Sequence, residues 1–340
     1  MKLLITGGYG FLGSNLAEYG LKNGIEIAIF DNLSRIGSVE NKKWLDTLGK
    51  HKHYHGDIRN RNDVDYCIKD YKPDYVFHLA GQVAMTVSLA NPILDFETNT
   101  IGTLNILESI RNNLPYTKLL YSSTNKVYGD LEQFTYKEGE TRYTCVEHSD
   151  GFNENIGLNF CSPYGCSKGA AEQYILDYYR AYDIQSVVFR HSSMYGERQF
   201  ASYNQGWVSW FCMQAILTKK NGNHVFDISG NGKQVRDLLF ASDMVGLYYN
   251  TINNFQRASG EAFNIGGGIK QSLSLLELFS ILECKLDTKL NYVKKEPRFS
   301  DQKVFIADIK KAEEYIGWSP TVSAEDGVEL MLRWLDDALE

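Results

Sequence analysis

Tyr164 and Lys168 are the side chains best placed to do chemistry together. They lie in the segment 162–169, which begins the longest expected helix, and they stand four residues apart. Side chains at this spacing share one face of a helix, and an ammonium beside a phenol lowers its pKa from about 10. The pair therefore predicts a tyrosine that acts as acid or base at neutral pH, although most such pairs on helices are structural.

A third polar side chain strengthens this interpretation. The segment 118–123 reads as an apolar strand and is followed by Thr124. Ligands of parallel sheets bind at the carboxyl ends of the strands, so Thr124 is expected to hydrogen-bond the same substrate oxygen as Tyr164. We therefore predict three catalytic residues, Thr124, Tyr164 and Lys168.

A glycine-spaced turn opens the chain directly after the apolar residues 3–5. Gly7, Gly10 and Gly13 lack side chains, so backbone N–H groups and the start of a helix can closely approach a pyrophosphate. Three glycines in a turn are weak evidence alone, but here an expected strand precedes them and an expected helix follows. The turn predicts a dinucleotide site.

The strand expected over 25–31 ends in Asp31, at the distance from the glycine turn expected for an acid that binds an adenosine ribose. Its carboxylate repels a 2′-phosphate, which favours NAD over NADP. Arg35 lies four residues later and tolerates a phosphate, so it weakens this preference slightly.

Apolar strands and amphipathic helices alternate through the first half of the chain. The expected strands are 3–6, 25–31, 53–58, 75–80, 118–123 and 186–191, and the expected helices are 11–23, 61–71, 95–113 and 164–182. This alternation predicts an α/β fold with a Rossmann-type, doubly wound parallel sheet covered on both faces.

Beyond residue 192 the pattern becomes irregular. Short strands (225–229 and 262–265), glycine turns and few long helices predict a smaller C-terminal α/β lobe that binds substrate. We expect residues 1–191, with 238–266 returning to them, to form the cofactor domain, and residues 192–237 and 267–340 to form the lobe. The polar segment 130–162 is expected to be a long excursion between strand and helix.

Composition excludes several classes of protein. The 340 residues carry a formal net charge of −7, which disfavours nucleic-acid binding because that requires a basic face. No apolar stretch reaches the roughly 18 residues of a membrane span, and the N-terminal residues read as a strand rather than a signal peptide. The six cysteines form no C-x-x-C pair. We expect reduced, mostly buried thiols in a cytoplasmic protein.

Three histidines at 51, 53 and 55 fall on one face of an extended segment. Three ligands spaced by two residues seldom converge on one ion. We therefore expect no metal site and read the histidines as a polar strand face.

Together, the glycine turn, Asp31, the hydroxyl-rich strand end and the Tyr164/Lys168 pair resemble the extended short-chain dehydrogenase/reductase family. More narrowly, they resemble its sugar-nucleotide epimerases and dehydratases. The segments 232–237 and 298–301 resemble the family's nucleotide-binding motifs, so the resemblance spans nearly the whole chain. It implies tightly held NAD, removal of a hydride from a sugar carbon, and its return to the product.

Asn125 and Lys126 narrow the class of reaction that the resemblance implies. The family's dehydratases place an acid and a base at these positions, and an amide cannot replace a carboxylic acid as proton donor. The segments 122–129, 190–196 and 205–207 instead resemble the subgroup that inverts C2 of CDP-activated 3,6-dideoxyhexoses for O-antigen synthesis. Ser193 stands where the family usually has Asn, which fits this subgroup.

The resemblance and the chemistry of such a sugar imply direct oxidation at C2, because the 3-methylene prevents a 4-ketone from acidifying the C2–H. Tyr164 would take the C2 hydroxyl proton while NAD takes the hydride. The 2-keto sugar would then turn and regain the hydride on its other face. Thr124 would orient the oxygen, and Lys168 would hold the nicotinamide ribose and keep Tyr164 acidic.

The resemblance also implies two sets of binding residues. The cofactor set is Gly7, Gly10, Phe11, Leu12, Gly13, Asp31, Asn32, Ser34, Arg35, Asp57, Ile58, Leu79, Ala80, Gln82, Asn99, Ser122, Tyr164 and Lys168. The substrate set is Gln82, Thr124, Ser193, Gln205, Arg236 and Arg298. The two arginines are forked donors suited to a pyrophosphate, but each has a neighbouring aspartate with which it could simply form an ion pair. Residues 83–88 could form a loop over the sugar, and the aromatic residues at 207 and 210 are read as packing or a subunit interface.

Two alternative functions stay open at this point. A C4-epimerase acting on a UDP- or CDP-hexose shares the same pattern of residues. A protein that senses NAD without turnover shares the fold, but such proteins often lose the tyrosine or lysine that this chain keeps. The family also commonly forms homo-oligomers, so a dimer or tetramer is expected.

Overall fold

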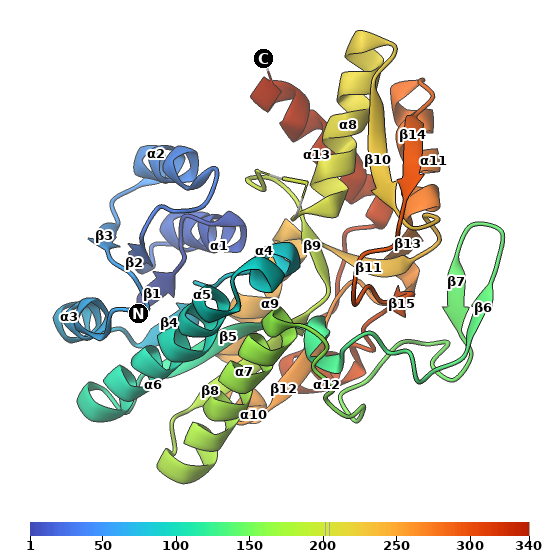
Figure 1. Cartoon of the computed structure of the whole chain (residues 1–340). Helices are drawn as coiled ribbons and strands as arrows, with labels where there is room; N and C mark the ends of the chain where they lie inside the picture. Colours follow the sequence, from blue (N-terminus) through green and yellow to red (C-terminus); the bar gives the residue numbers. More distant parts are fainter. Residues whose placement is uncertain (201, 204, 340) are drawn as a thin grey trace.

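A seven-stranded, fully parallel sheet organises the molecule, with the strand order β12-β8-β5-β4-β1-β2-β3 (Figure 1). The computed structural model describes residues 1–200, 202–203 and 205–339. The strands are β1 (Lys2–Thr6), β2 (Glu26–Asp31), β3 (Lys52–His55), β4 (Tyr75–His78), β5 (Lys118–Thr124), β8 (Ser186–His191) and β12 (Ala262–Ile265). All six strands expected in the first half are present, and the strand order reverses between β1 and β4, where ligands of such sheets bind.

Helices cover both faces of this sheet, because successive side chains of a strand point to opposite sides. Leu3 and Ile5 of β1 belong to one core, whereas Leu4 belongs to the other. The first core is covered by α1 (Phe11–Lys22), α2 (Ser38–Leu48), α9 (Ala241–Asn253), α10 (Phe255–Ala258) and α12 (Lys310–Ile316), and the second by α3 (Arg61–Tyr71), α6 (Gly102–Asn113) and α7 (Pro163–Tyr182). The predicted doubly wound α/β fold is confirmed.

Helix α7 begins and ends at residues with clear local causes. Ser162 caps it by accepting a hydrogen bond from the N–H of Gly165 (3.1 Å), and Pro163 occupies the first helical position. Asp183 ends the helix in a left-handed conformation, with φ of 55°. Tyr164 therefore lies in the first turn, where the sequence predicted it.

The helix expected over 95–113 is divided in three. It consists of α5 (Pro92–Phe96), a π-helical turn η1 (Glu97–Ile101) and α6, and the short helix α4 (Met85–Ala90) precedes them. A π-helical turn inserts an extra residue and is frequent at functional sites. Asn99, a predicted cofactor residue, lies in this turn.

The second part of the molecule contains two small sheets. Strands β9 (Ser193–Tyr195), β11 (Val235–Phe240), β13 (Ser272–Ser274) and β15 (Val304–Phe305) form one, and β10 (Val225–Ser229) pairs with β14 (Asn291–Lys295) in the other. The short helical turns are η2 (Asn125–Tyr128) and η3 (Ile269–Gln271).

The expectation of few long helices in this part was wrong. It contains α8 (Trp207–Asn221), α11 (Leu275–Leu286) and α13 (Ala324–Leu339). Helix α8 packs between α11 and α13, so it is apolar on most sides and lacks the one-sided pattern by which a surface helix is recognised.

The segment 130–162 includes a hairpin, β6 (Tyr136–Glu138) and β7 (Tyr143–Cys145), at the edge of the second part (Figure 1). Between its strands, the Nε and Nη2 of Arg142 donate to the carboxylate of Glu277 at 2.8 and 2.5 Å. Glu277 also completes the capping box of α11 with Ser274. One carboxylate thus joins the hairpin to the start of a helix far away in sequence.

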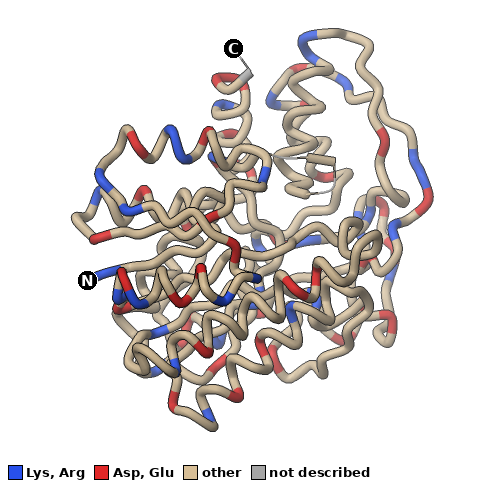
Figure 2. The backbone as a smooth tube through the Cα atoms, turned by 60° about the vertical axis from the view of Figure 1, so that its left-hand side comes forward, with Lys and Arg blue, Asp and Glu red and all other residues tan. Residues whose placement is uncertain are grey.

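Acidic and basic residues are intermixed along the described chain rather than gathered by sign on one face (Figure 2). Among the described residues, no helix combines the length and the apolar character needed to cross a bilayer. All six cysteines are free; Cys67, Cys145 and Cys212 are buried, whereas Cys166 and Cys284 are exposed.

The turn from β1 into α1 leaves no room for side chains. Gly7 adopts a left-handed φ of 67°, and its N–H binds the carbonyl of Phe30 at 2.8 Å. A Cβ on Gly13 would lie 2.5 Å from the carbonyl oxygen of Gly7 and 2.6 Å from the Cα of Gly8. The start of α1 can approach the end of β1 only because residue 13 is glycine.

We therefore expect Gly13→Ala to lower the free energy of unfolding by about 1–3 kcal/mol, because the clash is with backbone that cannot move aside. Urea-induced unfolding of the purified variant measures this. Gly157→Ala is the matched control, since a Cβ at Gly157 meets nothing within 4 Å. Equal stability of G13A and the unsubstituted chain would contradict the packing described.

Candidate active site

Tyr164 and Thr124 meet where α7 crosses the end of β5, as predicted. Tyr164 is buried, and burial raises the pKa of its phenol to about 12 because a phenolate loses hydration there. A hydrogen bond with the Thr124 side chain acts in the opposite direction and lowers this pKa. Thr124 therefore favours the phenolate form that an acid/base cycle requires.

Lys168 lies near this pair but is directed elsewhere. Its Nζ donates to the carbonyl of Ser122 at 2.5 Å and lies 4.2 Å from the ring centre of Tyr121. Burial lowers the pKa of Lys168 to about 7. Lys168 is not among the groups that shift the pKa of Tyr164 in this structure, and the charge that lowers this pKa is that of Arg35.

A buried ion pair fixes α7 against the sheet. Glu172 and Arg190 approach to 2.7 Å with side chains that are 0% and 7% exposed. Glu172 also accepts a hydrogen bond from Ser123 of β5 at 2.6 Å, and Arg190 donates to Tyr128 at 2.7 Å. Because Glu172 lies one helical turn after Lys168, this contact sets the position of the reactive face of α7.

A second group of predicted site residues, at the end of β2, is built around Asp31. Its carboxylate accepts the N–H of Tyr9 at 3.0 Å and that of Leu33 at 2.7 Å, so it ties the glycine turn to the loop after β2. Burial raises the pKa of Asp31, while these two backbone bonds lower it. The glycine cradle and this carboxylate fit the pyrophosphate and ribose of a dinucleotide.

The remaining predicted cofactor residues surround the same sheet edge. Asn32 joins Asp57 and Ser34 through hydrogen bonds of 3.3 and 2.7 Å, and Ile58 is buried beneath them in the second core. The N–H groups of Leu79 and Ala80 both donate to Thr6 Oγ1 at 3.2 Å. Phe11 and Leu12 begin α1 behind Gly10.

Asn99 and Gln82 are joined by two hydrogen bonds. Asn99 Oδ1 accepts the N–H of Gln82 at 2.9 Å, and Asn99 Nδ2 donates to the Gln82 carbonyl at 3.0 Å. The Gln82 side chain contacts Ala84 and Asp95. It therefore braces the loop after β4 and is not among the residues that line the cavity described next.

A cavity of about 260 Å³ opens beside Tyr164, between the main sheet and the second part of the molecule. It is lined by Val83, Met85, Asn125, Lys126, Tyr164, Ser192, Ser193, Tyr203, Trp207, Trp210, Phe211, Asp227, Ser229, Gln234, Arg236, Leu275, Arg298 and Asp301. Three predicted substrate residues, Ser193, Arg236 and Arg298, are in this wall. Val83 and Met85 come from the segment predicted to lie over the substrate.

Three cations reach the cavity. Arg236 pairs with Asp301 at 2.6 Å, so it both lines the cavity and forms the ion pair considered as the alternative. Lys126 donates to the Ser300 carbonyl at 3.0 Å, and burial beside Arg236 lowers its pKa to about 8. Arg298 lies 5.1 Å from the ring centre of Tyr203. Cations around one cavity suit an anionic ligand.

Two tryptophans that the sequence predicts to be packing or interface residues, Trp207 and Trp210, lie in this wall. Trp207 Nε1 donates to Ser193 Oγ at 3.0 Å, and Trp210 packs edge-on against Tyr203. Their place at the first turn of α8 puts them at the cavity, which the sequence did not signal. Gln205, predicted to bind substrate, lies just before them but is not among the lining residues.

The side chain of Asn125 is held in place by a second buried amide, that of Gln302. Its Nδ2 donates to Gln302 Oε1 at 2.9 Å, and Gln302 Nε2 in turn donates to the Gly129 carbonyl at 2.6 Å. Both side chains are buried. The Nδ2 of Asn125 and both polar atoms of Gln302 thus have hydrogen-bond partners. This agrees with the inference that residue 125 is not a general acid.

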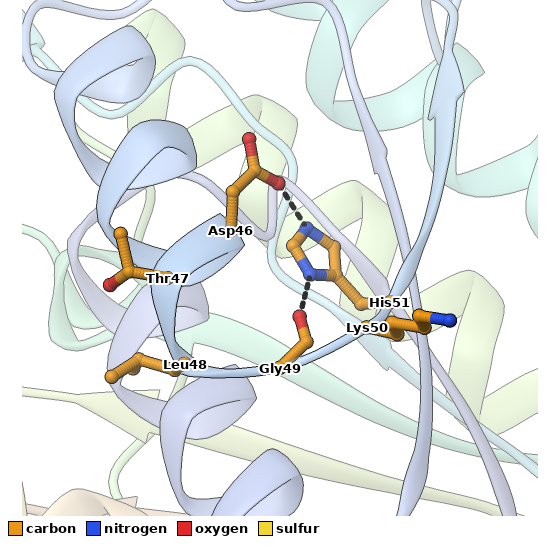
Figure 3. Close-up of a pocket in the computed structure, with 6 residues that line it drawn as sticks. All are labelled: Asp46, Thr47, Leu48, Gly49, Lys50 and His51. Carbon is orange, nitrogen blue, oxygen red and sulfur yellow. Dashed lines mark hydrogen bonds and ion pairs between the residues drawn. The ribbon is translucent and has the colours of Figure 1, made fainter.

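A shallow hollow at the end of α2 is formed by residues 46–51 (Figure 3). In it, His51 Nε2 lies 3.5 Å from Asp46 Oδ1, and His51 also contacts the hydroxyl of Tyr9. His53 packs edge-on against the ring of Tyr9. In the described part of the chain, no three His, Cys, Asp or Glu side chains gather as metal ligands would. The hollow contains none of the reactive groups.

The parallel sheet, the glycine cradle and the threonine, tyrosine and lysine at one strand edge define a dinucleotide-dependent enzyme of the short-chain dehydrogenase/reductase type. Residues 4–331 match the family described as GDP-mannose 4,6 dehydratase. The chain belongs to this family.

Known relatives align with nearly the whole length of the chain. CDP-paratose 2-epimerase of Salmonella typhi is 58% identical over 334 residues, which are 98% of this chain and 99% of that protein. UDP-glucose 4-epimerase of Thermus thermophilus, solved with NAD, is 26% identical, with a TM-score of 0.81 over 99% of this chain and 100% of that one. UDP-glucuronic acid 4-epimerase of Bacillus cereus, solved with UDP-glucuronic acid and NAD, has the same identity and coverage and a TM-score of 0.84.

We expect Arg190→Met to lower the free energy of unfolding by about 3–5 kcal/mol, because Glu172 is left buried and unpaired. Arg180→Met, on the helix that carries Glu172, breaks only the exposed pair with Asp177 and is expected to cost less than about 1 kcal/mol. Urea-induced unfolding compares the two variants. Similar losses in both would show that the buried pair does not anchor α7.

Proposed function

We propose that this chain is an NAD-dependent epimerase that inverts C2 of CDP-paratose to give CDP-tyvelose. The observation that carries the proposal is the 58% identity, over nearly the full length of both chains, to a CDP-paratose 2-epimerase. The site agrees chemically, since the phenol of Tyr164, which is hydrogen-bonded to Thr124, lines a cavity whose other walls carry cations. The product serves O-antigen synthesis in this proposal.

NAD is the proposed cofactor, and it supplies a reversible hydride acceptor when bound. Gly7, Gly10 and Gly13 would hold its pyrophosphate, and Asp31 would hold the adenosine ribose. Lys168 would bind the nicotinamide ribose, because its ammonium lies at the end of β5, on the Ser122 carbonyl.

The sugar chemistry falls to Tyr164 and Thr124. Tyr164 takes the proton of the C2 hydroxyl as C2 is oxidised, and gives it back when the C2 ketone is reduced on its other face. Thr124 hydrogen-bonds the reacting oxygen in both steps. Oxidation at C2 itself is required because the C3 methylene insulates C2 from a ketone at C4. The hydroxyl proton need never leave the site.

In this proposal one part of the molecule binds the cofactor and the other binds the sugar nucleotide. Residues 1–191 and 238–266 form the cofactor domain, and residues 192–237 and 267–340 form the sugar-nucleotide lobe. Arg236 and Arg298 are the proposed ligands of the substrate pyrophosphate, as their guanidinium groups line the cavity. Helix α12, within the second range, also packs against the first core.

We further propose that the protein works in the cytoplasm as a homo-oligomer, either a dimer or a tetramer. Free thiols suit a reducing compartment. Ile93 and Phe96 of α5 are 70% and 49% exposed, and Tyr174 of α7, a helix that packs against α5, is 45% exposed. Apolar side chains gathered on neighbouring helices suit a contact with a second copy.

Tyr164→Phe is expected to fold and to bind NAD but to lose about 10²- to 10⁴-fold in turnover, because no group remains to move the hydroxyl proton. Sugar configuration is followed by NMR after incubation with CDP-paratose. Tyr182→Phe, at the exposed end of the same helix, is the control and should retain full turnover. Near-normal turnover by Y164F would refute the assigned role.

CDP-paratose deuterated at C2 is expected to keep its label through epimerisation in ordinary water, because the hydrogen taken from C2 returns to C2. Mass spectrometry of the product measures retention. Loss of the label to solvent would mean deprotonation at C2 and would overturn the oxidation mechanism. A C4-epimerase would leave C2 unchanged and alter C4, which NMR of the same product reveals.

A further inference from the structure

Asp95 is a fully buried carboxylate, 0% exposed, that the mechanism above does not use. It lies on α5, and it forms no ion pair with any of the described residues. Three neutral groups hold it instead: Ser167 Oγ donates at 2.5 Å, Gln82 Nε2 at 2.8 Å and Asn99 Nδ2 at 3.4 Å. A carboxylate is costly to bury without a cation, so its presence needs an explanation.

The hydrogen bonds of Asp95 lead directly to the reactive helix. Ser167 lies between Tyr164 and Lys168 on α7, and its hydroxyl also approaches the Tyr164 carbonyl at 3.2 Å. Asn99 donates to the same hydroxyl at 2.9 Å. Asp95 therefore connects three segments. It binds the loop after β4 and the π-helical turn η1, and through Ser167 it joins them to the turn of α7 that carries Tyr164 and Lys168.

The charge of Asp95 also acts on that turn. It raises the pKa of Tyr164 and that of Lys168. The other titratable groups facing Asp95 are Cys166 on α7 and Tyr121 on β5. Helix α4 carries no titratable side chain, and Glu97 of η1 is exposed. Glu172 raises the pKa of Lys168 more than Asp95 does, and Glu172 itself is paired with Arg190.

We propose that Asp95 is a positioning residue for the epimerisation: it fixes Tyr164 and Lys168 through Ser167, and its negative charge keeps the Lys168 ammonium charged inside the protein. Burial alone favours a neutral amine at position 168, and a neutral amine is a poorer hydrogen-bond donor to a ribose than an ammonium. The proposal rests on the proposed function, because it concerns protons that move during that reaction.

Asp95→Asn tests the charge, since the amide keeps the size and one acceptor oxygen. The pH profile of kcat/KM for CDP-paratose should move as a whole to lower pH, by about one unit, because both reactive groups lose the same negative neighbour. Asp177→Asn, which removes an exposed charge from α7, the helix of Tyr164 and Lys168, should leave the profile in place. Asp95→Ser is a second charge-free variant in case D95N does not fold.

Ser167→Ala tests the hydrogen bond separately. It keeps the charge of Asp95, so kcat should fall at least threefold while the pH profile stays where it is. The proposal is overturned if D95N and D95S have the profile of the unsubstituted enzyme, if S167A moves the profile as far as they do, or if S167A keeps full kcat.

A second measurement does not depend on the substrate. In the NAD-bound protein, ultraviolet titration of tyrosinate is compared between chains with and without Tyr164→Phe, so that the difference reports Tyr164 alone. Asp95→Asn should shift that difference to lower pH, and no shift would overturn the charge role. If the unsubstituted enzyme does not turn over CDP-paratose, the proposed function fails while this titration still decides the role of Asp95.

Discussion

The contact of Glu172 with Arg190 and Ser123 is the constraint on which the site depends. It joins α7 to both strands beneath it, β5 and β8, inside the protein where water cannot substitute for either partner. One turn earlier on the same helix lies Lys168, and one turn before that lies Tyr164. The catalytic face of α7 therefore has a single position relative to the strand end that carries Thr124.

The burial that holds α7 in a single position also shifts the pKa values of the reactive groups. It raises the pKa of Tyr164 to about 12 and lowers that of Lys168 to about 7, so both groups are pushed toward their neutral forms. Thr124 and Arg35 favour the phenolate, whereas Asp95 and Glu172 favour the ammonium. The protonation of the pair is thus decided by residues of β5, α5, α7 and the loop after β2, rather than by the spacing of two residues on a helix.

The sequence was sufficient to predict the sheet, the glycine turn and the meeting of Thr124 with Tyr164. These features depend on local patterns: continuously apolar strands buried on both faces, glycines without room for a Cβ, and a Ser-Pro helix start. It was not sufficient for α8 or for Trp207 and Trp210, because a helix enclosed by α11 and α13 has no polar face to mark its period. The direction of the Lys168 ammonium could not be predicted either, since the Ser122 carbonyl belongs to a strand 46 residues away.

Glu277 has a consequence for how the molecule opens. Its carboxylate caps α11 through Ser274 and at the same time binds Arg142 in the β6–β7 hairpin. Fraying of the helix start releases the arginine, and lifting the hairpin weakens the cap. The two segments, more than 100 residues apart in sequence, therefore form one cooperative unit for amide hydrogen exchange. We therefore expect the hairpin to be as well protected from amide exchange as the helix it touches, although two short strands alone would be only marginally stable.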